Sequence, residues 1–100
     1  MGKTSDNQIV PGISVTPTGQ ATVDPSVEDL LFDLAIKLEE LTNLPVDIEH
    51  VLAAIVLAAR NGELAPQTPL SSDDRGLTQI LAVYVKTVFE RFGGKVGRDD

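Results

Sequence analysis

The sequence contains no cysteine, no tryptophan and a single histidine, His50. The absence of cysteine excludes disulfide bonds, thiolate metal sites and cysteine nucleophiles, and it is consistent with a reducing compartment. Three phenylalanines and one tyrosine are the only aromatic residues, so a core must be mainly aliphatic. With 42% hydrophobic residues in a chain of 100, there is enough apolar material for one folded domain.

Long hydrophobic runs are also missing. The longest apolar run covers only residues 51–59, whereas a membrane-spanning helix needs about 20 residues. The first residues, 1–6, lead into no apolar run of signal-peptide length. We therefore expect a cytoplasmic protein that does not enter a membrane.

Basic residues are scarce, since 8 Lys and Arg stand against 15 Asp and Glu and leave a net charge of −7. Residues 24–50 contain eight carboxylates and one lysine, Lys37, so this segment accounts for the whole net charge. Because phosphate contacts need Lys and Arg, we expect no binding to nucleic acid. The acidic segment is interpreted as a solvated helix face, with a basic protein partner as the alternative.

Residues 1–23 are predicted to form a flexible, mostly disordered N-terminal tail. The residues that favour a loop there are Pro11, Gly12, Pro17 and Gly19. Two β-favouring stretches, 13–16 and 21–23, are able to pair, but a lone hairpin is only marginally stable in water. The tail also suits a peptide that docks along a groove or a sheet edge.

The rest of the chain predicts an all-α fold class, a small three-helix bundle over residues 24–94. Asp24 and Pro25 suit the start of the first helix. Ser71, followed by acidic residues, suits the start of the third. The helices are expected at about 25–43, 45–61 and 72–92, and residues 95–100 form a frayed C-terminus.

These helices carry more apolar surface than a three-helix bundle can bury. Phe32 and Ile36 lie off the apolar face of the first helix, beside an expected ion pair between Asp33 and Lys37. The second helix is apolar on all sides, and the apolar arc of the third spans roughly 200°. A two-fold dimer of six helices would cover the excess. We therefore expect a homodimer with an interface that contains Phe32, Ile36, Val85 and Phe89.

Residues with catalytic or metal-binding chemistry form no recognised motif. His50 and Asp47 lie one turn apart, but two ligands are a weak metal signal, and His50 is interpreted as a surface or boundary residue of its helix. Residues 93–97 are rich in glycine but follow a helix, so they do not form a phosphate loop. Residues 71–74 lack the ligand alternation of a calcium loop. We expect no catalytic, cofactor-binding or metal site and no enzyme activity.

The predicted function is a non-enzymatic protein–protein interaction module that self-associates: an adaptor, a small regulatory subunit or an assembly chaperone. The alternative is a small-molecule-binding helical module with its ligand between the helices. The small residues that would line such a site are Ala53, Ala54 and Ala58.

Overall fold

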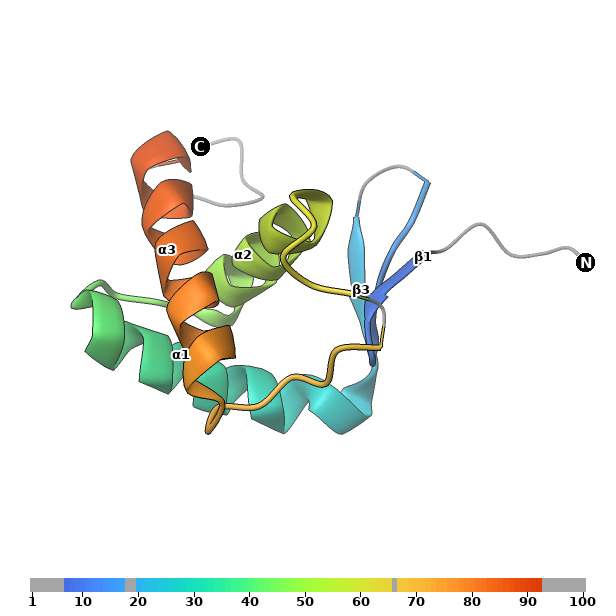
Figure 1. Cartoon of the computed structure of the whole chain (residues 1–100), viewed down its shortest axis with the longest axis horizontal. Coiled ribbons are helices and arrows are strands. Elements are labelled where there is room, and N and C mark those ends of the chain that lie inside the picture. Colours follow the sequence, from blue (N-terminus) through green and yellow to red (C-terminus); the bar gives the residue numbers. More distant parts are fainter. Residues whose placement is uncertain (1–6, 18–19, 66, 93–100) are drawn as a thin grey trace, which may run out of the picture.

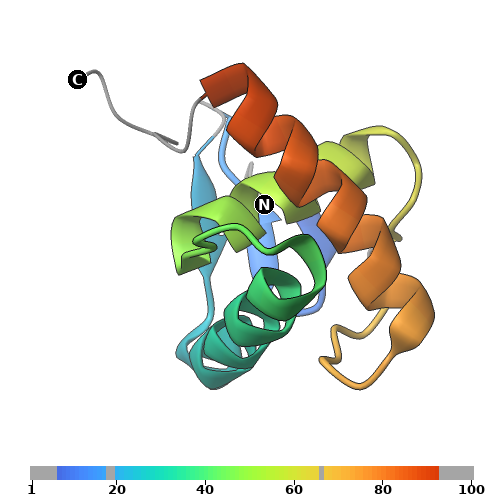
Figure 2. The ribbon, with the colours of Figure 1, turned by 90° about the vertical axis from the view of Figure 1, so that its left-hand side faces the viewer.

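The computed structural model describes residues 7–17, 20–65 and 67–92. α2 lies between α3 and a small sheet, and α1 runs across the bottom of the view below them (Figure 1). Turned by 90°, the molecule shows α3 crossing in front of α2 (Figure 2). In chain order the elements are β1 (Asn7–Val10), β2 (Ile13–Val15), β3 (Ala21–Val23), the 3₁₀ helix η1 (Pro25–Val27), α1 (Glu28–Thr42), α2 (Ile48–Arg60) and α3 (Arg75–Phe92).

The predicted all-α fold class is wrong, because the segment expected to be a mostly disordered tail forms a three-stranded antiparallel sheet with the order β1-β2-β3. Pro11 and Gly12 make the turn between β1 and β2, and Gly12 has a φ of 88°. Pro followed by a residue with positive φ is the pattern of a type II turn, which the sequence displays as Val10-Pro11-Gly12-Ile13. Residues 1–6 of the predicted tail lie outside the described residues.

Packing against the helices stabilises this sheet. Val10 and Ile13 are fully buried in the same core as the helices. Asp24 N–H donates to the carbonyl of Gly12 at 2.8 Å, which ties the start of the helical part to the β1–β2 turn. The expectation of disorder treated the strands as an isolated hairpin, whereas the observed sheet has a third strand and packs its apolar face against the helices.

An aspartate caps the start of η1, α2 and α3, whereas α1 follows η1 directly and has no side-chain cap. Asp24 accepts from Ser26 N–H at the start of η1, and Asp74 accepts from Leu77 N–H at the start of α3. Asp47 caps α2, which therefore begins at Ile48 rather than at the expected Pro45. Residues 95–100, predicted to be a frayed end, lie outside the described residues. Within the described ranges, no helix is long and apolar enough to cross a membrane.

The core is aliphatic and draws on both the sheet and the helices. The largest fully buried side chains are Val10, Ile13, Leu31, Leu34, Leu38, Val51, Ile55, Leu81, Val85 and Val88. α2, apolar on all sides, contacts α1, α3 and β1. The sheet thus covers apolar surface of α2 that a bundle of three helices would have left exposed, and so removes part of the reason for expecting a dimer.

Candidate interaction surface

The four residues predicted to form an interface lie in three different environments. Phe32 and Ile36 are 55% and 59% exposed on α1. Val85 is fully buried in the core. Phe89 is half-buried, and its ring centroid lies 4.4 Å from that of His50. The structure therefore keeps Phe32 and Ile36 together on the surface and separates them from Val85 and Phe89.

The exposed pair lies on the side of α1 that faces away from the core. The buried residues of α1 are Leu31, Leu34, Ala35 and Leu38. At 100° per residue, Phe32 and Ile36 project from the opposite side, one turn apart. We call this side the outer face of α1, and it consists of Glu28, Asp29, Phe32, Asp33, Ile36, Lys37, Glu39 and Glu40.

The outer face of α1 is strongly acidic around its apolar pair. Its five carboxylates and one ammonium give a net charge of −4, and all of these side chains are exposed. Helical geometry places Glu28 and Glu39 on one side of the pair, and the other three carboxylates on the other side. An apolar pair with carboxylates on both sides is the principal feature of this surface.

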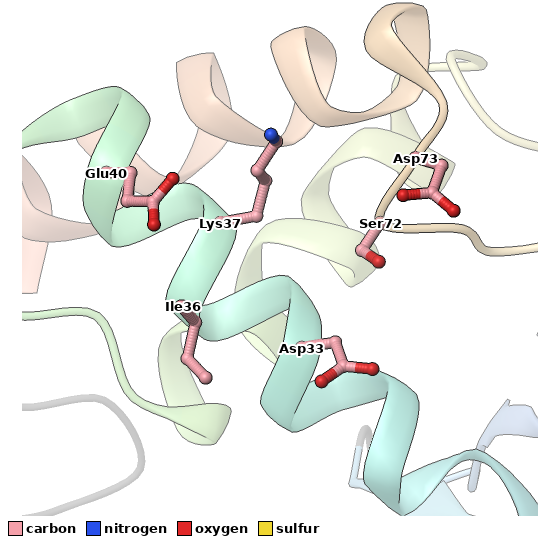
Figure 3. Close-up of a pocket in the computed structure, with 6 residues that line it drawn as sticks. All are labelled: Asp33, Ile36, Lys37, Glu40, Ser72 and Asp73. Carbon is pink, nitrogen blue, oxygen red and sulfur yellow. The ribbon is translucent and has the colours of Figure 1, made fainter.

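The expected ion pair between Asp33 and Lys37 does not form within the part of the chain that the structure describes. Lys37 instead extends away from Ile36, toward α3, in the close-up view (Figure 3). Among the described residues, the carboxylates beside the apolar pair therefore form no ion pair with Lys37, which is the single cation of the outer face.

A hollow of about 260 Å³ lies beside Ile36, between α1 and the loop that precedes α3 (Figure 3). It is lined by Asp33, Ile36, Lys37, Glu40, Ser72 and Asp73. Asp73 N–H donates to Ser71 Oγ at 3.1 Å, which shapes this loop. Three carboxylates against one ammonium make the hollow acidic. No group of three potential metal ligands suited to hold an ion occurs among the described residues.

A second hollow, of about 340 Å³, separates the α1–α2 connection from the C-terminal half of α3. It is lined by Thr42, Leu44, Lys86, Phe89 and Glu90. Its two charged residues have opposite signs, in contrast to the hollow beside Ile36. Phe89 therefore belongs to a different, electrically balanced surface.

His50 is 6% exposed, so the prediction of a surface or boundary residue is wrong and the side chain is buried. Asp47 N–H donates to His50 Nδ1 at 2.8 Å, while the Asp47 carboxylate accepts from His50 N–H and from Ile48 N–H. This reciprocal pair is a capping box, in which a Glu or Gln normally stands where His50 does. In the sequence, this capping box corresponds to the spacing Asp-x-x-His. The observed contacts give His50 a structural role.

The alanines of the alternative ligand site lie on α2 inside the fold. Ala54 and Ala58 are fully buried, and Ala53 is half-buried. Neither of the two hollows above is lined by any of the three. A further exposed apolar residue that periodicity did not single out is Val83, which is 61% exposed on α3.

Comparison of the chain with protein-family models, with curated proteins and with solved structures gives no match.

Proposed function

We propose that this protein is a non-enzymatic interaction module that binds another protein chain through the outer face of α1. An adaptor, a small regulatory subunit and an assembly chaperone all act in this way. The observation that carries the proposal is the pair Phe32 and Ile36, both more than half exposed and one turn apart. Two large apolar side chains on adjacent turns form one contact point, because residues four apart on a helix are neighbours.

Apolar side chains at these two positions are not required by the fold. Positions 32 and 36 face away from the core, so polar residues would be tolerated there without loss of packing. Surrounding positions on the same face are charged. Burial of the pair against a second chain would gain free energy in proportion to the apolar area covered, about 25 cal/mol per Å². The proposal includes a cytoplasmic location, which the cysteine-free composition favours.

The proposal includes self-association of the protein, and the strength of this association should depend on the salt concentration. An antiparallel two-fold contact that sets Phe32 of one copy against Ile36 of the other also brings Glu28 of one copy near Glu40 of the other. Like charges across an interface oppose association. Because salt screens such repulsion, a homodimer formed through this face should be favoured by high ionic strength.

Light scattering over a concentration series tests self-association. We expect the purified protein to be monomeric at about 50 mM salt and to approach twice the monomer mass at about 1 M salt, where the screening length falls to about 3 Å. Phe32→Asp combined with Ile36→Asp should abolish the dimer, while Val83→Asp, on α3, should not. A monomer under both conditions would contradict self-association and leave another protein as the partner.

A further inference from the structure

We propose that the partner of the outer face of α1 is a basic amphipathic helix of another protein. This inference rests on the proposed function and specifies the chemistry of the bound chain. It is carried by the combination of the exposed pair Phe32 and Ile36 with the carboxylates on both sides of it.

The apolar pair fits a helix as its partner. α1 has 15 residues, so it is about 22 Å long, and the pair lies near its middle. An amphipathic helix presents apolar residues at intervals of three and four, which pack across a ridge formed by positions 32 and 36. Glu28 and Glu40 stand where this ridge would continue in either direction, so the apolar contact is short.

The carboxylates of the outer face then determine which charge the flanking residues of the partner helix must carry. A helix laid across the pair would bring its flanking residues close to Glu39 on one side and to Asp29 on the other. Acidic flanks on the partner would be repelled, whereas Lys or Arg would be attracted, and complementary charge is what gives an interface its specificity. A partner with a narrow apolar stripe and basic flanks therefore matches this face.

The acidic hollow beside Ile36 provides a place for one of these cations. Asp33, Glu40 and Asp73 line it together with Ile36. A partner residue in this hollow would meet carboxylates on α1 and on the loop before α3 at once (Figure 3). Arginine suits such a position, because its guanidinium can donate to two carboxylates from a weakly hydrated planar group.

Three other occupants fit less well. A second copy would bring another net charge of −4 against the same face. Nucleic acid would be repelled by the carboxylates, because its phosphates require basic contacts. A metal ion is disfavoured because the described residues contain no suitable group of ligands.

The experiment uses three synthetic helical peptides of about 18 residues. The first has a leucine stripe with Lys and Arg on its flanks. The second keeps the leucines and replaces the basic residues with Glu. The third keeps the basic residues and replaces the leucines with Ala. Each peptide is titrated into the full-length protein, and binding is followed by fluorescence anisotropy and by amide chemical shifts.

The basic leucine peptide should bind at least about tenfold more tightly than either of the other two, because it alone matches both the apolar pair and the charge. Its largest chemical-shift changes should fall on α1 between Glu28 and Glu40. Raising salt from about 50 mM to about 500 mM should weaken its binding several-fold.

Matched variants locate the site. Phe32→Ser with Ile36→Ser keeps every charge and should weaken binding of the basic leucine peptide about tenfold. Asp33→Asn with Glu40→Gln keeps the apolar pair. It should reduce the difference in binding affinity between the basic leucine peptide and the Glu peptide. Val83→Ser removes an apolar side chain of similar exposure on α3. It should change neither the affinity for the basic leucine peptide nor the difference in affinity between the basic and the Glu peptides. Thermal unfolding of each variant checks that the fold is retained.

Distinct outcomes separate this inference from the proposed function. Equal binding of the basic and the Glu peptides to the outer face would overturn the inference and leave the proposed function in place. Binding of the basic peptide that is insensitive to the changes at Phe32 and Ile36 would overturn it as well. If no peptide binds but the protein dimerises through this face, the occupant is a second copy. Failure of both peptide binding and dimerisation would count against both proposals.

Discussion

His50 makes two contacts near the beginning of α2, a hydrogen bond and a contact between aromatic rings. Its ring nitrogen Nδ1 accepts from Asp47 N–H at 2.8 Å. The ring plane also packs at a 33° tilt against Phe89 of α3. One side chain therefore links the α2 cap to α3, which explains why the only histidine is buried.

Replacing His50 separates these two contacts. His50→Ala should lower the free energy of unfolding by about 2 kcal/mol, since it removes a cap and an aromatic contact that are each worth about 1 kcal/mol. His50→Gln keeps an acceptor at the capping-box position and should lose only about half as much. Urea unfolding measures both. Equal losses in the two variants would show that the hydrogen bond to Asp47 N–H does not stabilise the fold.

Asp24 provides the pH-dependent cap of η1. The Ser26 N–H and the Ser26 side chain both hydrogen-bond its carboxylate and hold the pKa of Asp24 below its ordinary value of 3.8. A lowered folded-state pKa means that the stabilisation is fully present above the ordinary pKa and is lost as the pH falls through the folded-state value.

Variants at position 24 test this pH dependence. Asp24→Ala should lower the melting temperature at neutral pH, and the gap to the wild type should close as the pH falls below the folded-state pKa. Asp24→Asn keeps a capping oxygen that does not titrate, so it should stay closer to the wild type at neutral pH. A gap between wild type and Asp24→Ala that is constant down to pH 2 would contradict the role of the ionised carboxylate.

At the scale of elements, the helices were predictable and the sheet was not. Apolar periodicity marks each helix over many residues, and the error lay in the capping turns, where Asp47 and Asp74 begin α2 and α3 later than Pro45 and Ser71 suggested. The strands have three or four residues each, too few to establish an alternating pattern. Their stability comes from contact with distant helices, which no local pattern records.

The contribution of the sheet to the core can be measured at Ile13. Ile13→Ala should cost about 2–4 kcal/mol in the free energy of unfolding, because this fully buried side chain leaves a cavity against the helices. Val15→Ala, in the same strand but half-buried, should cost at most about 1 kcal/mol. If neither change affects urea unfolding, the strands do not belong to the cooperative fold.

At the scale of the whole molecule, the candidate surface was predictable only in part. Helical periodicity identified Phe32 and Ile36 as residues off the core face of α1, since this follows from spacing along one helix. The same reasoning failed to place Val85 and Phe89, because the width of an apolar arc does not tell which neighbour covers it. In the fold, the core encloses Val85 and His50 packs on Phe89.

The acidic hollow was beyond sequence analysis for a related reason. Asp33 and Asp73 are 40 positions apart in the sequence, and only the path of the loop before α3 brings them to one hollow. The concentration of carboxylates in residues 24–50 did appear in the sequence. Its arrangement around an exposed apolar pair required the orientation of α1 on the core.

Site-specific photo-crosslinking tests most directly whether the outer face of α1 binds a second protein chain. A benzophenone amino acid would replace Phe32 in one variant and Val83 in the other, which are 55% and 61% exposed on different helices. Irradiation of cells that express each variant should give a discrete protein adduct from position 32 and none from position 83. Absence of an adduct at position 32, or equal adducts at both positions, would contradict the assignment of this face as the interaction surface.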